Sequence, residues 1–145
     1  MRKLMIGAAA LAMLVGIGPA MAQQSSVKAG PMWTAARIMV EDGQMQNYMD
    51  YLTKTWMANQ DYAKSQGWLL EYHILQSLNP RDQEPNIILI TRFKDMPSAA
   101  EGERRSEILN KRLSLDAHSG DAASGARGPM RKLMGSVLYR EMVKR

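Results

Sequence analysis

The sequence contains no cysteine and only two histidines among its 145 residues. Without thiols the chain forms no disulfide bonds, holds no iron–sulfur cluster or covalently attached c-type haem, and performs no thiolate catalysis. The histidines, His73 and His118, lie far apart in the sequence and are too few for a zinc site of the usual composition. We therefore predict no metal site and no cofactor, and expect the hydrophobic core to hold the domain together.

Signature motifs of common enzyme classes are missing as well. The sequence has no P-loop, no Gly-x-Gly-x-x-Gly, no Gly-x-Ser-x-Gly and no kinase signature. Methionine is frequent, and Met45/Met49 and Met130/Met134 form i, i+4 pairs whose thioethers are the type of ligand that Cu(I) prefers. Because Met45 and Met49 lie on the apolar stripe of an expected helix, we interpret them as core packing.

The N-terminus has the three parts of a signal peptide. Basic residues at positions 2 and 3 precede an uncharged apolar run over residues 4–17, and a small-x-small pattern ends at Ala22. The run is shorter than the roughly 20 apolar residues of a membrane-spanning helix. We predict a signal peptide over residues 1–22, cleaved after Ala22, which sends the chain to the periplasm or outside the cell. A retained N-terminal anchor is the alternative, but we expect no stable membrane insertion after cleavage.

Cleavage changes the size and charge of the working protein. Removing residues 1–22 from the 145 leaves 123, which is one ordinary domain. The whole chain carries a formal charge of +5, and loss of Arg2 and Lys3 leaves +3. Six basic residues and one acidic residue lie in 127–145. A basic end of this kind can bind nucleic acid, but export argues against that partner, and a solvated surface is the preferred interpretation.

Hydrophobic periodicity predicts two helices and four strands. The first helix, over 43–66, carries an apolar stripe, with Asp42 as its expected N-cap and Gly67 as its stop signal. The second helix starts at Ser98 with a capping box to Glu101 and ends near His118, whose position suggests pairing with the helix dipole. The strands are expected over 33–40, 68–76, 87–93 and 136–143, with a flexible leader over 23–32, a mobile loop over 119–128 and a helical turn within 129–134.

The order β-α-β-β-α-β predicts an α+β domain over 33–145 with the ferredoxin-like arrangement. In that arrangement the four strands form one antiparallel sheet, and both helices cover the same face of it.

The chain resembles the dimeric α+β barrel superfamily, which includes antibiotic-biosynthesis-monooxygenase-like proteins. The resemblance extends from about Trp33 to Val143. It rests on the element order, the aromatic first helix, the Gly-Trp-Leu-Leu-Glu-Tyr transition at 67–72 and the Arg-Glu-Met stretch at 140–142. It implies a homodimer in which two sheets pack face to face and leave a ligand cavity on the helix-free face of each sheet. It does not imply a particular reaction.

Strand parity nominates four polar residues for that helix-free face: Arg37, Glu71, His73 and Arg92. Such a set could hold an anionic ligand, or it could transfer protons with His73 as the base and Glu71 or an arginine tuning it. The alternative is a solvated or salt-bridged sheet surface. Glu71 and His73 share a face whenever the strand is formed, because they are two residues apart.

The leading functional hypothesis is an exported homodimer that binds a small organic molecule, aromatic or anionic. The first alternative is a cofactor-independent monooxygenase or isomerase that uses His73 with Glu71 and Arg92. The second is an envelope interaction protein without a ligand, whose basic C-terminal end binds an acidic partner.

Overall fold

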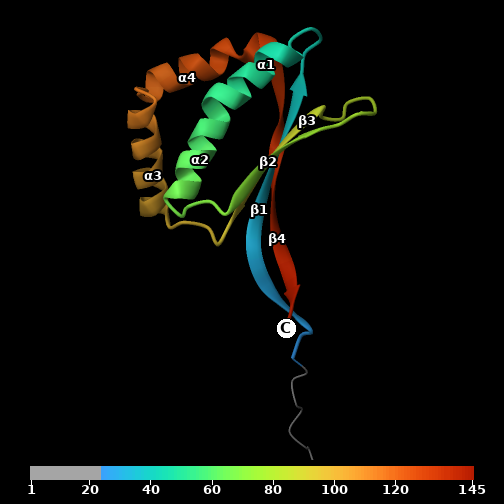
Figure 1. Ribbon diagram of the computed structural model, residues 1–145, viewed down its shortest axis with the longest axis vertical. Helices are drawn as coiled ribbons and strands as arrows, with labels where there is room; N and C mark the ends of the chain where they lie inside the picture. The colour runs from blue at the N-terminus through green and yellow to red at the C-terminus, as the bar shows by residue number, and fades with distance from the viewer. Residues whose placement is uncertain (1–23) are drawn as a thin grey trace, which may run out of the picture.

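The computed structural model describes residues 24–145, and the predicted signal peptide over 1–22 lies outside the described residues. The elements follow in the order β1 (Val27–Val40), α1 (Met45–Tyr51), η1 (Leu52–Met57), α2 (Ala58–Ser65), β2 (Glu71–Gln76), β3 (Ile87–Phe93), α3 (Ala99–Arg112), α4 (Ala117–Ala126), η2 (Gly128–Met130) and β4 (Arg131–Lys144). The strands form one antiparallel sheet in the order β2-β3-β1-β4, with the helices on one side of it (Figure 1). This is the ferredoxin-like arrangement, so the predicted fold class is confirmed.

The first helix is one continuous rod made of α1, η1 and α2, as the periodicity predicts. Its middle segment, Leu52–Met57, is a π-helix. The predicted N-cap was wrong: Gln44 takes that position without a side-chain hydrogen bond, because Gly43, with φ of 75°, forms a turn between Asp42 and the helix.

The core lies between this rod and the sheet. Its buried members are Ile38, Val40, Tyr48, Leu52, Ile87 and Leu89. Met45, Met49 and Met130 pack against this cluster, so the first of the two methionine pairs is core packing as interpreted. Asn86 bridges β3 and β1 at the edge of the core: its Oδ1 accepts a 2.7 Å hydrogen bond from the amide of Val40, and its Nδ2 donates a 2.9 Å bond to the carbonyl of Val40.

The predicted flexible leader was wrong for residues 27–32, which form the first part of β1. This part pairs with the end of β4, with Val27 opposite Lys144 and Ala29 opposite Met142. Because β3 pairs with β1 only from Met32 onward, the two outer segments form a two-stranded arm that projects from the body of the sheet (Figure 1). The pairing partner lies more than 100 residues away, so local sequence carries no sign of it.

Strand β4 is also longer than the 136–143 expected. It begins at Arg131 and passes through Gly135, which has a φ of 90°. Gly135 lies next to the point where the register with β1 shifts, between Ala36 and Ile38. A glycine at positive φ accommodates such a β-bulge without ending the strand. The predicted strand over 68–76 is shorter than expected: it begins at Glu71, because the chain turns at Gly67, with φ of 71°.

Two helices replace the expected second helix and mobile loop. Ser98 caps α3 by accepting a hydrogen bond from the amide of Glu101, as predicted, but α3 ends at Arg112. The loop predicted over 119–128 was wrong, because Asp116 and Ser119 form a capping box that starts α4. His118 therefore lies in the first turn of α4, where the helix dipole disfavours a cation, and the predicted dipole pairing was wrong.

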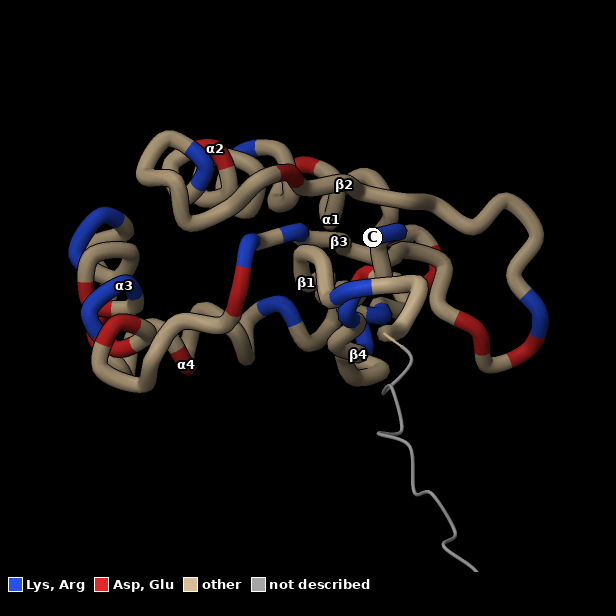
Figure 2. The backbone as a smooth tube through the Cα atoms, turned by 90° about the horizontal axis from the view of Figure 1, so that it is seen from below, with Lys and Arg blue, Asp and Glu red and all other residues tan. Residues whose placement is uncertain are grey.

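Helix α3 packs through charged and aromatic side chains and contains no buried residue. The guanidinium groups of Arg104 and Arg105 lie 5.7 and 5.2 Å from the Trp68 ring centre, and that of Arg112 lies 4.7 Å from the Tyr62 ring centre. Figure 2 shows the alternation of acidic and basic residues along α3. Among residues 24–145, the helices are all too short or too polar to cross a membrane.

Candidate functional site

The sheet has one face without helices, and the strand register places the nominated residues on it. Because Ile38, Val40, Ile87 and Leu89 face the helices, residues of the opposite parity face away. Across the strands, Glu71 lies opposite Arg92, Arg92 opposite Trp33, and Trp33 opposite Tyr139. His73, Ile90, Ala35 and Val137 form the next row, and Leu75, Ile88 and Arg37 the one after it.

Arg92 is the centre of a charged network on this face. Its Nη1 donates to Glu71 Oε1 over 3.0 Å, and its Nη2 donates to Glu141 Oε2 over 3.0 Å. Trp33 Nε1 donates a 3.1 Å hydrogen bond to the same Glu141 oxygen, and the Arg92 guanidinium carbon lies 5.0 Å from the Trp33 ring centre. The Arg92 side chain is 27% exposed and the two carboxylates about a third, so the network is half-buried.

His73 lies at the edge of the network. Its Nε2 is 3.9 Å from Glu71 Oε2, and its side chain is half-exposed. This distance permits an ion pair when the imidazole is protonated, but it is too long for a hydrogen bond. The predicted proximity of Glu71 and His73 is therefore present, and His73 is free to contact a ligand.

Arg37 is the one nominated residue that stands apart. It lies opposite Ile88, two rows from Arg92 on the same face. Its charge contributes to lowering the pKa of Glu84, which falls mainly because the Arg81 side chain and backbone donate hydrogen bonds to that carboxylate. Of the four nominated residues, the structure joins Glu71, His73 and Arg92 and leaves Arg37 outside their contacts.

Trp33 and Glu141 belong to the network and were not nominated. The sequence leaves the parity of the last strand ambiguous, because β4 contains register shifts that local alternation does not reveal. Only the pairing of Trp33 with Tyr139 assigns Tyr139 and Glu141 to the helix-free face. The one signal in the sequence was Trp33, which has the same strand parity as Arg37 and therefore belongs to the same sheet face.

Exposed apolar side chains lie beside this network, in its own row and in the two rows next to it. Leu75, Val137 and Tyr139 are 47, 38 and 54% exposed, and Ile88 and Ile90 are partly exposed between them. A contiguous apolar sheet face open to solvent is uncommon in a monomer and is typical of an interaction surface.

The charges of the network define what it can bind. Both terminal nitrogens of Arg92 are engaged by the chain's own carboxylates, Glu71 and Glu141. One guanidinium against two carboxylates leaves a formal charge of −1, with the remaining oxygen lone pairs as acceptors. The network therefore favours a hydrogen-bond donor over an anion. Within the described residues, no group of three His, Asp or Glu side chains is arranged to hold a metal ion.

The basic C-terminal segment uses most of its charges in contacts within the chain. Arg127 and Arg131 lie over the rings of Tyr51 and Tyr48, at 4.4 and 5.8 Å. Arg140 forms a 3.1 Å ion pair with Asp95, and the Nε of Arg145 donates to a backbone carbonyl of β1. Among the described residues, Arg140 is the one basic residue of this segment that pairs with a carboxylate, so the segment keeps most of its positive charge.

Comparison with known proteins yields similarity in fold only. No family model matches the sequence, and no curated protein sequence is significantly similar to it. Among solved structures, a candidate monooxygenase from Shewanella loihica is 16% identical, with a TM-score of 0.48 over 79% of this chain and 96% of that one. A dimeric ferredoxin-like protein of unknown function from Thermobifida fusca is 14% identical, with a TM-score of 0.43 over 80% and 93%. A hypothetical protein of Arabidopsis thaliana is 11% identical, with a TM-score of 0.42 over 83% and 94%.

Proposed function

We propose that the chain is an exported homodimer that binds a small organic molecule between two helix-free sheet faces. The observation that carries this proposal is the exposed apolar rim of Leu75, Val137 and Tyr139 beside a half-buried polar network. A second copy of the same face would remove the rim from water and convert the open sheet into an enclosed cavity. A mostly apolar cavity with a few convergent polar groups is the usual form of a small-molecule site.

The ligand that best fits the network is a neutral aromatic molecule with a hydroxyl group. The hydroxyl would donate to Glu71 or Glu141, whose positions Arg92 holds, and the aromatic body would lie against Trp33 and Tyr139. Arg37 would lie at the periphery of the cavity, and His73 would line its wall.

The mass of the purified protein tests this function. Native mass spectra of the mature chain, isolated without denaturation, are expected to contain a dimer carrying an additional small mass. A ligand-free monomer at micromolar concentration would overturn the proposal, because the cavity requires two sheets.

The contact between His73 and Glu71 favours a second function. A half-exposed imidazole 3.9 Å from a carboxylate can take a proton from a ligand and return it, as a cofactor-independent monooxygenase or isomerase requires. Oxygen consumption with quinol-type substrates tests it. A rate above the uncatalysed one that His73→Ala abolishes would support catalysis, and equal rates for the two proteins would remove His73 from any mechanism.

Export remains part of the proposal. It is supported by the three-part N-terminal pattern and by the start of β1 at Val27, so that loss of residues 1–22 would leave every described element intact. N-terminal sequencing of the chain recovered from the periplasm is expected to begin at Gln23. Recovery of the chain with Met1 in the cytoplasm would contradict export.

A further inference from the structure

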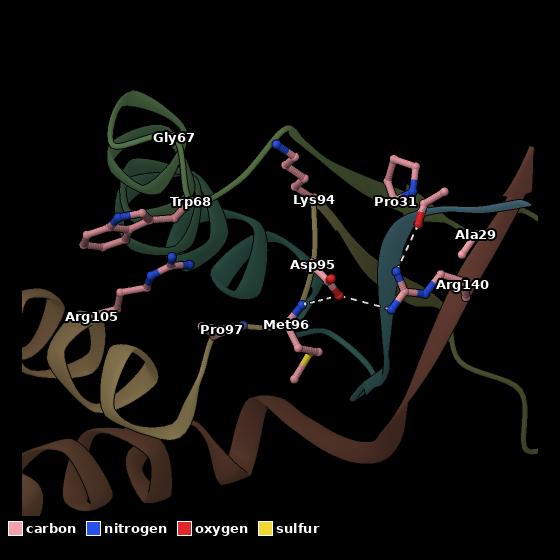
Figure 3. A pocket seen from close by; sticks show the side chains of 11 residues that line it. Ala29, Pro31, Gly67, Trp68, Lys94, Asp95, Met96, Pro97, Arg105 and Arg140 are labelled. Atoms are coloured by element: carbon pink, nitrogen blue, oxygen red, sulfur yellow. Dashed lines mark hydrogen bonds and ion pairs between the residues drawn. The ribbon is translucent and has the colours of Figure 1, made fainter.

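A cleft lies on the helix side of the sheet, away from the network around Arg92. It encloses about 730 Å³ between the α2–β2 turn, the β3–α3 loop and the base of the β1/β4 arm. Figure 3 shows Trp68 and Arg105 at one end of the cleft and the pair Asp95 and Arg140 at the other. The cleft exists because α3 contacts α2 and Trp68 through arginine side chains and does not pack closely against the sheet.

The charged groups that line this cleft are mostly cationic: Lys94, Arg105 and Arg140 against one carboxylate, Asp95. Asp95 accepts a 3.1 Å bond from Arg140 and a 2.9 Å bond from the amide of Met96, and these contacts lower its pKa. Asp95 and Arg140 therefore neutralise each other, and the other terminal nitrogen of Arg140 donates to the carbonyl of Gly30. Arg105 is likewise paired with Glu101. Lys94 takes part in none of the ion pairs among residues 24–145.

Apolar side chains form the rest of the lining, among them the planar indole of Trp68. Trp68 is partly exposed, and its ring lies roughly perpendicular to that of Tyr62 at 5.8 Å, and 5.2 Å from the Arg105 guanidinium, two contacts that hold the indole in place. Pro31, Met96 and Pro97 complete the apolar wall. A rigid indole in the same cleft as the ammonium group of Lys94 matches a ligand that has both an aromatic body and an anionic group.

We propose that this cleft binds a small aromatic carboxylate, with Lys94 at the carboxylate and the partly exposed indole of Trp68 against the ring. The site is separate from the sheet-face cavity and needs no second copy of the chain. It also differs in chemistry, since the sheet-face network favours a neutral donor and this cleft favours an anion.

The three tryptophans allow the site to be located directly, because each reports a different region. Trp33 lies on the helix-free face, Trp56 lies on the first helix and packs against Tyr72 of β2, and Trp68 lines the cleft. Nitrogen-15 labelling of tryptophan gives three indole signals, which Trp33→Phe and Trp68→Phe assign. The probe is 2-naphthoate, compared with the neutral 2-naphthylmethanol and with inorganic phosphate.

Titration of the folded protein with 2-naphthoate is expected to shift the Trp68 signal and leave the Trp33 signal in place. Replacing Lys94 by Gln should weaken this binding about fivefold, since a charge-assisted contact at a solvent-accessible site is lost. Lys111→Gln, on an exposed position of α3, is the matched control and should bind as the wild type does.

Three results would overturn this site. A shift of Trp33 without Trp68 would place the probe on the sheet face, and would leave the proposed dimer cavity standing. Equal affinity for the naphthoate and the alcohol would remove the role of the Lys94 charge, and equal affinity for phosphate would remove the role of the aromatic wall. Unchanged affinity in Lys94→Gln would likewise contradict the assignment of that residue.

Discussion

Trp33 and Arg92 lie directly opposite each other on β1 and β3, with the guanidinium carbon 5.0 Å from the centre of the indole ring. This pair links β1 and β3, the two central strands, on the helix-free face of the sheet. Arg92 also donates to Glu71 on the neighbouring strand, and Trp33 donates to Glu141 on the other side. One cross-strand pair thus connects all four strands of the sheet through side chains alone.

Replacing Arg92 by Gln should destabilise the fold. The change leaves Glu71 and Glu141 without their shared cation and removes the stacking contact on Trp33, with an expected loss of about 1–2 kcal/mol in the free energy of unfolding. Urea unfolding monitored by circular dichroism measures this difference.

The matched control for that experiment is Arg81→Gln. Arg81 forms an ion pair with Glu84 in the β2–β3 connection, where the Arg81 side chain is 86% exposed. Exposed pairs contribute little, so the expected change is within about 0.5 kcal/mol. Equal losses for the two variants would contradict the network at Arg92.

The acid stability of α3 should depend on Glu101. Hydrogen bonds from Arg104 and then Arg105 lower the pKa of this carboxyl from 4.5 to about 2. Because the pKa is lowered in the folded state, the ionised carboxylate stabilises the fold at pH values above its ordinary pKa of 4.5. This stabilisation is lost as the pH falls from 4.5 to about 2.

Thermal unfolding of the wild type and Glu101→Gln therefore should differ most near neutral pH and converge as the pH approaches 2. Glu103→Gln, on the same helix but without an ion pair to either arginine, should follow the wild type at every pH. A constant difference between wild type and Glu101→Gln across this range would contradict the pairing.

The β1/β4 arm should tolerate no side chain at Gly30. A Cβ there would lie 2.9 Å from Val143 Cγ1 and 3.1 Å from the carbonyl oxygen of Glu141. Gly30→Ala is expected to separate the two strands, at a cost of about 1–3 kcal/mol, and to speed amide hydrogen exchange in the arm.

Gly125→Ala is the control, since a Cβ at this position of α4 would meet nothing within 4 Å beyond its chain neighbours and the backbone of its own helix. Alanine in a helix should be neutral or stabilise it by up to about 1 kcal/mol. If Gly30→Ala left exchange in the arm unchanged, the close approach of the two strands would be wrong.

The sequence predicts the parts of this molecule whose signals are local. The strand at 87–93 and the apolar stripe of the first helix depend on neighbouring residues, and both are confirmed. The pairing of Val27 with Lys144 depends on residues at opposite ends of the chain, and the predicted leader missed it. Helix α4 was missed because its small residues resemble those of a loop, while its start depends on the capping box at Asp116.

The residues of the candidate site also differ in whether local sequence could reveal their positions. Glu71 and His73 share a face by spacing alone, and strand parity also placed Arg92 correctly. Parity places residues on a face but does not give the row, so Arg37 was grouped with residues that it does not contact. Glu141 was missed because the bulges in the β1/β4 ladder interrupt the alternation that would reveal it.

The most direct test is whether the helix-free face joins two copies of the chain. Val137 and Leu138 are neighbours in β4, 38 and 49% exposed, and they point to opposite faces because they lie opposite Ala35 and Thr34. Sedimentation equilibrium of the wild type, Val137→Asp and Leu138→Asp, each shown to be folded by circular dichroism, compares the two faces. A dimer is expected for the wild type and for Leu138→Asp, with a dissociation constant raised at least about 100-fold in Val137→Asp, where a charge would be buried. A monomeric wild type, or a Val137→Asp variant that dimerises as tightly as the wild type, would contradict a cavity formed by two sheet faces.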